Sequence, residues 1–91
     1  MPTKILVADQ VREYQRSLAP QPRRKLKAAI LALPVGDTRA LTDELDGLHR
    51  LRVGQYRVIY RHGEESIECI FAEERKIVYE YLAAHLSELL P

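Results

Sequence analysis

The chain has 91 residues, of which 46% are apolar and 30% are charged, and its formal net charge is +1. This length and composition predict one soluble globular domain over residues 1–91, with a modest core. A net charge so close to zero argues against nucleic-acid binding through a generally basic surface, so a basic site would have to be local. The single cysteine, Cys69, excludes an internal disulfide, and its apolar neighbours predict a buried thiol in a reducing compartment.

The first residues do not follow the pattern of a secretory signal peptide, and no apolar run approaches the roughly 20 residues that span a bilayer. We therefore expect a cytoplasmic protein that makes no membrane contact. No metal site is indicated, because His62 and His85 lack a neighbouring cysteine or a suitably spaced carboxylate. His49 is expected on the core side of a strand, as a structural residue. No cofactor is expected.

Residues 4–8 predict a short first strand, and Asp9 is suited to cap the helix that follows. A second helix is expected with Pro22 in its first turn. Its apolar stripe consists of Leu26, Ala29, Ile30 and Leu33. These two helices would form a helical hairpin with one apolar face. Residues 34–46 predict a loop, with a helical turn around residues 41–45.

From Gly47 the apolar period changes to two, which predicts strands at 47–53, 56–61 and 66–72. Gly54-Gln55 is expected to form a two-residue type II′ turn, since glycine favours its first position. The resulting register sets Arg52 opposite Arg57. Side chains alternate along each strand, so the hairpin has an apolar face and an arginine face. The arginine face carries Leu48, Arg50, Arg52, Arg57, Ile59 and Arg61. Two arginines directly opposite each other repel, and this face needs an anion, a carboxylate or a partner.

With a second turn at 62–65, Tyr60 would face Ile67 and Val58 would face Cys69. Ile67, Cys69 and Phe71 would then join the apolar face, while Glu68 would lie on the arginine face beside Ile59.

A last helix is expected from Val78 to Leu90, with the option of one short strand around residues 76–78 before it. Its apolar stripe consists of Val78, Leu82, Leu86 and Leu89. The predicted fold is α+β: a short N-terminal strand, a two-helix hairpin, an antiparallel β-meander and a C-terminal helix, with the helices packed on one face of a curved sheet.

The central segment reads Leu-x-Gly-x-x-Arg-x-Arg-x-Gly-x-Tyr-Arg-x-x-Tyr, with a basic residue later, shortly before Val-Tyr. The positions are Leu45, Gly47, Arg50, Arg52, Gly54, Tyr56, Arg57 and Tyr60, then Arg75 and Val78-Tyr79. This pattern and the order of elements resemble the RelE/ParE superfamily of toxins from bacterial type II toxin–antitoxin systems. The resemblance covers nearly the whole chain.

The resemblance implies a ribosome-dependent endoribonuclease that cuts mRNA, arrests translation and is neutralised by a cognate antitoxin. It implies catalytic roles for Arg57, Arg75 and Tyr79. It implies RNA-binding roles for Arg50, Arg52 and Arg61. Guanidinium groups hold phosphates in bidentate geometry and stabilise developing charge. A tyrosine can transfer protons where nearby cations lower its pKa.

Glu73 and Glu74 depart from the family pattern, because many members carry Gly-His or a similar pair before the arginine. We interpret these carboxylates as surface charges or as partners of Arg75 and the sheet arginines. Two alternatives to the nuclease stay open. One is a ParE-type, non-enzymatic toxin that inhibits DNA gyrase, and the other is an inactive relative retained for antitoxin binding.

Overall fold

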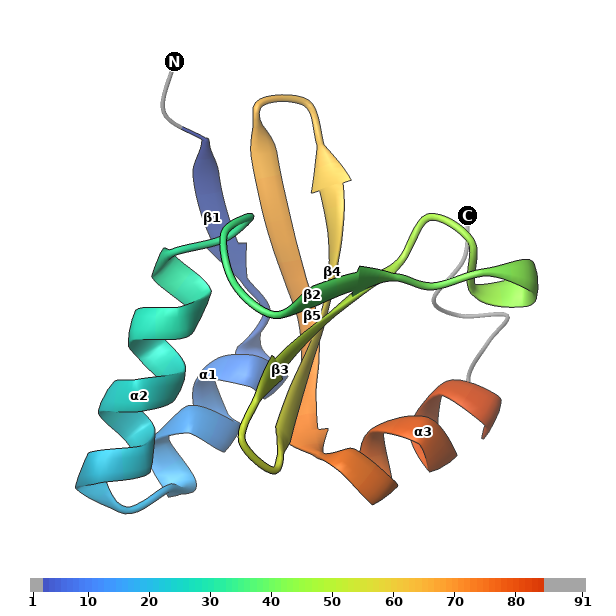
Figure 1. The fold of residues 1–91 in the computed structure, drawn as a ribbon. Coiled ribbons are helices and arrows are strands. Elements are labelled where there is room, and N and C mark those ends of the chain that lie inside the picture. The colour runs from blue at the N-terminus through green and yellow to red at the C-terminus, as the bar shows by residue number, and fades with distance from the viewer. Residues whose placement is uncertain (1–2, 85–91) are drawn as a thin grey trace.

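The computed structural model describes residues 3–84, which form a five-stranded sheet flanked by three helices (Figure 1). In chain order the elements are β1 (Lys4–Val7), α1 (Asp9–Ser17), α2 (Pro20–Leu31), β2 (Thr38–Ala40), the 3-10 turn η1 (Asp43–Leu45), β3 (His49–Val53), β4 (Tyr56–Gly63), β5 (Ser66–Glu74) and α3 (Arg75–Ala84). The strand order is β1-β5-β4-β3-β2, with β1 parallel to β5 and all other pairs antiparallel. The predicted α+β fold is therefore confirmed.

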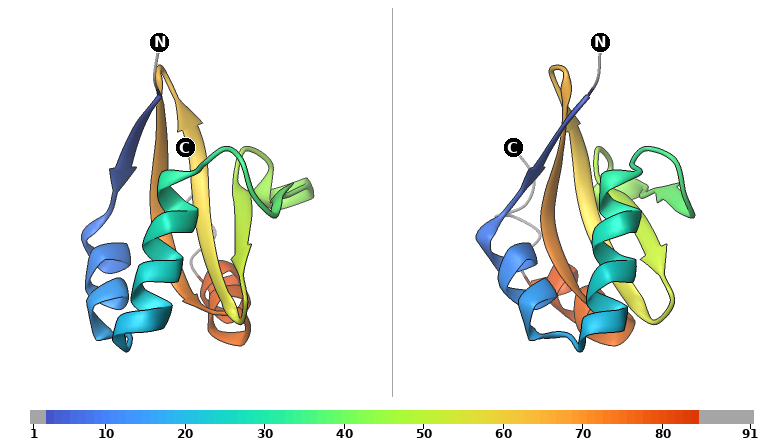
Figure 2. Two further views of the ribbon diagram at one scale, coloured as in Figure 1. Left: turned by 60° about the vertical axis from the view of Figure 1, so that its left-hand side comes forward. Right: turned by 90° about the vertical axis from the view of Figure 1, so that its left-hand side faces the viewer.

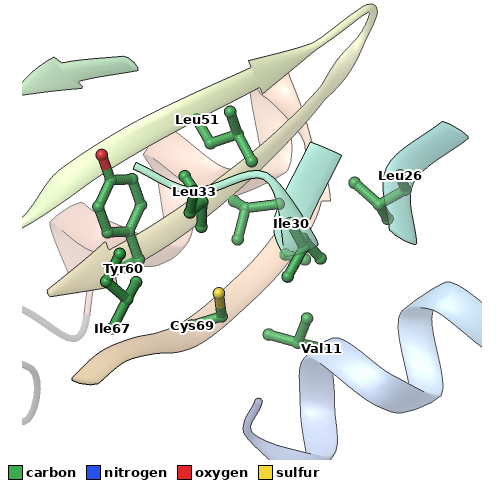
Figure 3. Close-up of a cluster of buried hydrophobic side chains, with 10 residues drawn as sticks. Val11, Leu26, Ile30, Leu33, Leu51, Tyr60, Ile67 and Cys69 are labelled. Carbon is green, nitrogen blue, oxygen red and sulfur yellow. The ribbon is translucent and has the colours of Figure 1, made fainter. Parts of the chain in front are cut away.

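The sheet buries apolar side chains on both of its faces. On one face, α1 and α2 lie side by side over the larger cluster (Figures 2 and 3). That cluster contains Val11, Leu26, Ile30, Leu33, Leu51, Val58, Tyr60, Ile67, Cys69 and Ala72. On the other face, α3 covers a smaller cluster of Leu48, Ile59, Phe71, Val78 and Leu82. The expectation that all helices share one face is corrected, because Leu48 and Ile59 alternate onto the arginine face and α3 buries them.

Helix α1 is fixed to β5 by the amide of Gln10. Its Nε2 donates to the carbonyl of Ala72 at 2.7 Å, and its Oε1 accepts from the Ala72 N–H at 2.8 Å. The N-cap of α1 is Ala8, and no side chain caps it. Asp9, the expected cap, is instead the first helical residue, where its charge complements the helix dipole. Helix α2 begins at Pro20, so Pro22 lies in its first turn as expected.

The β3–β4 hairpin has the predicted register. Arg52 pairs with Arg57 and Val53 with Tyr56. Gly54 has a φ of 60°, the left-handed value that the first position of a II′ turn requires. The alternation of an apolar face and an arginine face is therefore real.

The predicted register between β4 and β5 is wrong. Tyr60 pairs with Cys69 and Val58 with Ala72, because the turn is tighter than expected and the register shifts next to Ile59. This β-bulge adds a residue to β5 and turns Phe71 onto the α3 face, although Ile67 and Cys69 join the apolar face as predicted. Glu68 lies opposite Arg61 and not beside Ile59. Burial raises the pKa of the Cys69 thiol to about 11.

Two segments differ from the predicted elements. Strand β2 lies in the expected loop, while η1 matches the expected helical turn. Helix α3 begins at Arg75, so the optional strand around residues 76–78 is helical instead. Val78 and Leu82 are buried as predicted, and Leu86 and Leu89 lie outside the described residues. Within residues 3–84, no helix has the length and apolar character needed to cross a membrane.

His49 lies on the apolar face with two aromatic neighbours. It stacks on Tyr60 with ring centroids 5.1 Å apart, and His62 meets it edge-on at 4.8 Å. Burial, and then the charge of His62, lower the pKa of His49. The folded protein therefore favours neutral His49.

We expect the Leu26→Ala substitution to lower the free energy of unfolding by about 2–5 kcal/mol, because Leu26 is fully buried between α2 and the sheet. Leu31→Ala is the matched control on the same helix, since Leu31 is 61% exposed, and it should cost less than about 0.5 kcal/mol. Urea denaturation measures both. Equal losses would contradict the assigned apolar face of α2.

The lowered pKa of His49 makes the free energy of unfolding depend on pH. Unfolded histidine has a pKa of about 6.5, so below that pH the unfolded state binds more protons than the folded state, and stability falls. His49→Gln should therefore lose less unfolding free energy than the wild type between about pH 7.5 and about pH 5.5. Urea denaturation at the two pH values tests this. An identical loss in both proteins would contradict it.

Candidate functional site

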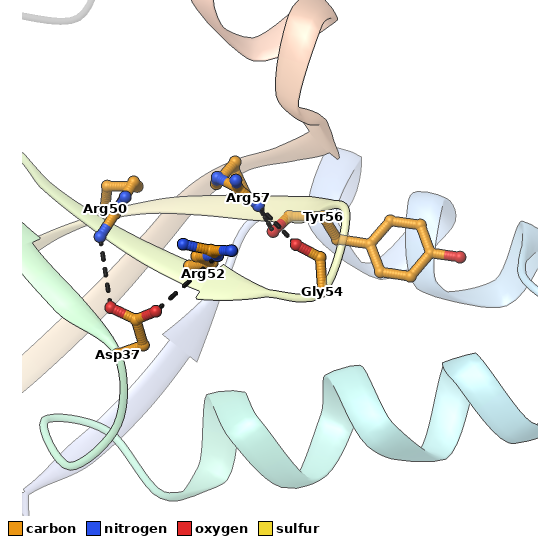
Figure 4. Close-up of polar contacts among 6 residues, drawn as sticks. All are labelled: Asp37, Arg50, Arg52, Gly54, Tyr56 and Arg57. Atoms are coloured by element: carbon orange, nitrogen blue, oxygen red, sulfur yellow. Dashed lines mark hydrogen bonds and ion pairs between the residues drawn. The ribbon is translucent and has the colours of Figure 1, made fainter.

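Arg57 lies at the centre of the arginine face and is only 5% exposed. Its Nη1 donates to the carbonyl oxygens of Gly54 at 2.8 Å and Tyr56 at 2.9 Å, so the guanidinium is tied to the hairpin turn (Figure 4). Its Nε is buried and has no hydrogen-bond partner within the described part of the chain. Because an unpaired buried donor is costly, this nitrogen is available to an acceptor that residues 3–84 do not supply.

Three further arginines surround Arg57. Burial, then the charges of Arg52 and Arg50, lower the pKa of Arg57, and Arg75 adds to this effect. Tyr79 acts in the opposite direction. We call Arg50, Arg52, Arg57 and Arg75 the arginine cluster. The charges of Arg50, Arg52 and Arg75 make the potential at Arg57 positive, and an anion bound there would relieve it.

Asp37 supplies a carboxylate to this cluster. Its Oδ1 is 3.4 Å from Nη2 of Arg50, and its Oδ2 is 3.9 Å from Nε of Arg52 (Figure 4). The Arg52 N–H also donates to the Asp37 carbonyl at 2.9 Å. Even so, Nε of Arg50 is buried without a partner among residues 3–84. The hairpin pattern predicted the need for a carboxylate, but nothing in the loop sequence identified Asp37.

Arg75 and Tyr79 reach the cluster from α3. Arg75 is the first residue of this helix. Its N–H donates to the carbonyl of Gln55 at 3.0 Å, which anchors the start of α3 to the hairpin turn. Tyr79 follows one turn later and is 43% exposed. The structure therefore gathers five of the six predicted site residues.

Arg61 is the predicted site residue that stands apart. Its Nε forms an ion pair with Oε2 of Glu68 at 2.7 Å. It lines a separate hollow with Leu6 and Ile70, near β1. Its guanidinium therefore already has a carboxylate partner.

Glu73 and Glu74 do not neutralise the cluster. Glu73 pairs with Arg57 in the sheet register, yet within residues 3–84 neither glutamate forms an ion pair with Arg57 or Arg75. Burial, followed by the charges of Glu73 and Glu74, raises the pKa of Tyr14 on α1. Their interpretation as arginine partners is therefore wrong, and Glu74 is a surface charge. In the described residues no group of three or more potential ligands is placed to hold a metal ion.

Asp37→Asn should lower the free energy of unfolding by about 1 kcal/mol, because it removes the carboxylate that Arg50 and Arg52 share. Millimolar sulfate should recover most of this loss by binding the cluster, whereas chloride at equal ionic strength should recover less. Thermal unfolding of both proteins in the two salts measures the effect. Equal recovery in sulfate and chloride would contradict an anion site.

No family model matches the chain, and no curated protein matches it. Solved structures do match. A chain of the RelBE2 toxin–antitoxin complex from Mycobacterium tuberculosis aligns with a TM-score of 0.69 and 20% identity, over 82% of this chain and 93% of that one. A chain of the RelE–RelB complex from Pyrococcus horikoshii aligns with a TM-score of 0.62 and 27% identity, over 82% and 97%.

The YoeB/ParE toxin from Agrobacterium tumefaciens aligns with a TM-score of 0.64 and 15% identity, over 80% of this chain and 99% of that one. All three alignments span nearly the whole of the matched chains. The resemblance drawn from the central arginine pattern is thus confirmed by the arrangement of the elements: this chain has the fold of the RelE/ParE toxins.

Proposed function

We propose that the protein is the toxin of a type II toxin–antitoxin pair and that it arrests translation by cleaving mRNA on the ribosome. The observation that carries the proposal is the arginine cluster, in which two guanidinium Nε atoms are buried with no partner among the described residues, beside the exposed Tyr79. Such donors suit a phosphate, because a phosphate accepts several hydrogen bonds and its negative charge complements the positive charge of the cluster.

Cleavage of RNA requires an electrostatic function and a proton-transfer function. The ribose 2′-oxygen bonds to phosphorus while the bond from phosphorus to the 5′-oxygen breaks, and negative charge grows on the phosphate oxygens. The arginine cluster stabilises that charge, and its buried members are held in place before the substrate binds. A proton must leave the 2′-hydroxyl and another must reach the 5′-oxygen. Arginine stays protonated, so Tyr79 is the proton-transfer residue of the proposal.

An antitoxin is the second part of the proposal. The RelBE2 structure that this chain resembles is a toxin–antitoxin complex. In this chain, Asp37 already binds Arg50 and Arg52, so a carboxylate can occupy the same positions as a phosphate. We expect an antitoxin to neutralise the protein by placing acidic side chains on the arginine cluster and excluding mRNA from it.

Tyr79→Phe tests the proposal without disturbing the fold, since Tyr79 is 43% exposed and the change removes only its hydroxyl. We expect cleavage of a reporter mRNA to fall about 100-fold or more, the usual effect of losing a proton-transfer group. Primer extension after brief induction measures it. The control is Ile77→Ala, because Ile77 is equally exposed on the same helix and should leave cleavage unchanged.

The Arg57→Ala variant is a poor probe, because it also removes the two hydrogen bonds to the turn. Arg52→Gln is better, since the side chain is 56% exposed, and it should weaken cleavage while preserving the unfolding free energy. Full cleavage in both Tyr79→Phe and Arg52→Gln would overturn the assignment. Intact mRNA in growth-arrested cells would instead support a non-enzymatic toxin that acts on DNA gyrase.

A further inference from the structure

Asp37 lies between two members of the arginine cluster, and both of its contacts are weak (Figure 4). Its Oδ1 is 3.4 Å from Nη2 of Arg50, and its Oδ2 is 3.9 Å from Nε of Arg52. The Asp37 side chain is 58% exposed, so water competes for both carboxylate oxygens. Ion pairs of this length and exposure contribute little free energy, and a better-placed anion can therefore replace the carboxylate.

Asp37 uses only half of the donor edge of Arg50. Nε and Nη2 form one edge of the planar guanidinium, and their N–H bonds point in nearly the same direction, which suits two oxygens of one anion. Asp37 contacts this edge at Nη2, while Nε is buried with no partner among residues 3–84. An anion that contacts both nitrogens must therefore take the place of Asp37 at Nη2.

The unpaired donor of Arg57 adjoins the positions that Asp37 occupies, because Arg52 and Arg57 are cross-strand neighbours. Nη1 of Arg57 is held by the turn carbonyls, and its Nε is buried without a partner in the described part of the chain. An RNA strand carries a phosphate at every nucleotide. A strand with one phosphate at Arg57 therefore brings a further phosphate close to Arg50 and Arg52.

The backbone of Asp37 is fixed, so only its side chain has to move. Its carbonyl accepts from the Arg52 N–H at 2.9 Å, and the next residue, Thr38, pairs with Leu51 in the sheet. On the other side, Gly36 has a φ of 137°, and a Cβ at this position would lie 3.3 Å from Cδ1 of Leu51. Because the carboxylate is exposed, rotation about the Cα–Cβ bond of Asp37 releases both arginines without opening the sheet.

We propose that Asp37 is an internal competitor of the RNA phosphates. In the free protein its carboxylate occupies Arg50 and Arg52, and it rotates into solvent when a phosphate of the RNA binds these two arginines. The contact is therefore autoinhibitory, since it lowers the affinity of the arginine cluster for RNA. This inference rests on the proposed function, because it takes RNA as the ligand of the cluster.

The Asp37→Asn variant tests the competition. Its matched control is Asp9→Asn, because Asp9 is also exposed and also pairs weakly with an arginine, Arg12 at 3.7 Å, on a helix that covers the opposite face of the sheet. Fluorescence anisotropy measures the Kd of each full-length protein for a short 2′-O-methylated oligouridine, which lacks the hydroxyl needed for cleavage. We expect Asp37→Asn to bind about fivefold more tightly than the wild type, which corresponds to about 1 kcal/mol, and Asp9→Asn to match the wild type. An unchanged Kd in Asp37→Asn would overturn the proposal.

A second background distinguishes displacement from simple repulsion between Asp37 and RNA. In Arg52→Gln, the weak pair with Arg50 is the contact of Asp37 that RNA still has to displace. Adding Asp37→Asn to this variant should therefore improve the Kd by only about twofold. Repulsion through space would give the same gain in both backgrounds, and that result would contradict displacement.

The binding measurements do not depend on cleavage, so this inference and the nuclease proposal can fail separately. An unchanged RNA affinity in Asp37→Asn, in a protein that cuts the reporter mRNA, overturns the internal competitor and leaves the nuclease in place. The expected gain in affinity, in a protein that leaves mRNA intact, supports the internal competitor and contradicts the nuclease. Asparagine has nearly the shape of aspartate and keeps the backbone hydrogen bond to Arg52, so the variant retains the fold in which both outcomes are measured.

Discussion

The structure depends on one unfavourable contact, the cross-strand pair of Arg52 and Arg57. Like charges directly opposite each other destabilise a hairpin, and Arg57 is also buried. The chain offsets this cost locally. The turn carbonyls of Gly54 and Tyr56 accept from Arg57, and Asp37 lies against Arg52. The II′ turn therefore sets the register, and its carbonyls also hold the central guanidinium.

Two hydrophobic clusters keep this hairpin in place, one on each face of the sheet. The α1–α2 cluster packs against Leu51, Val58 and Tyr60, while α3 packs against Leu48 and Ile59. The strands between them cannot rotate or slip without exposing one of these clusters to water. That constraint makes it possible to bury a charged side chain. It also holds the guanidinium groups of the cluster in a fixed geometry, which preorganised electrostatic stabilisation requires.

The hairpin could be predicted from sequence because its signals are local: a glycine turn, alternation, and arginines at fixed spacing. The β4–β5 register could not, since a bulge next to Ile59 leaves no mark in residue types, and it moved Phe71 to the opposite face. Strand β2 is three residues long and mostly exposed, so its sequence shows no alternation of apolar and polar residues that would predict a strand. Asp37 was missed for a related reason. It lies in a loop, and only the folding of distant segments brings it to Arg50 and Arg52.

The same positive potential serves binding and opposes folding. A cluster whose buried donors find no partner in the described part of the chain gains stability from an anion that binds it, so the free protein is less stable than its complexes. An antitoxin carboxylate and an RNA phosphate would both bring this gain, and they would compete for it. Asp37 limits this competition, because it neutralises Arg50 and Arg52 only in part and leaves Nε of Arg57 without a partner within residues 3–84. A carboxylate of this chain that bound the arginines more tightly would stabilise the fold, but it would also prevent an external anion from binding the cluster. The weak, exposed ion pairs of Asp37 with Arg50 and Arg52 help to keep the hairpin folded and leave Nε of Arg57 available to a ligand.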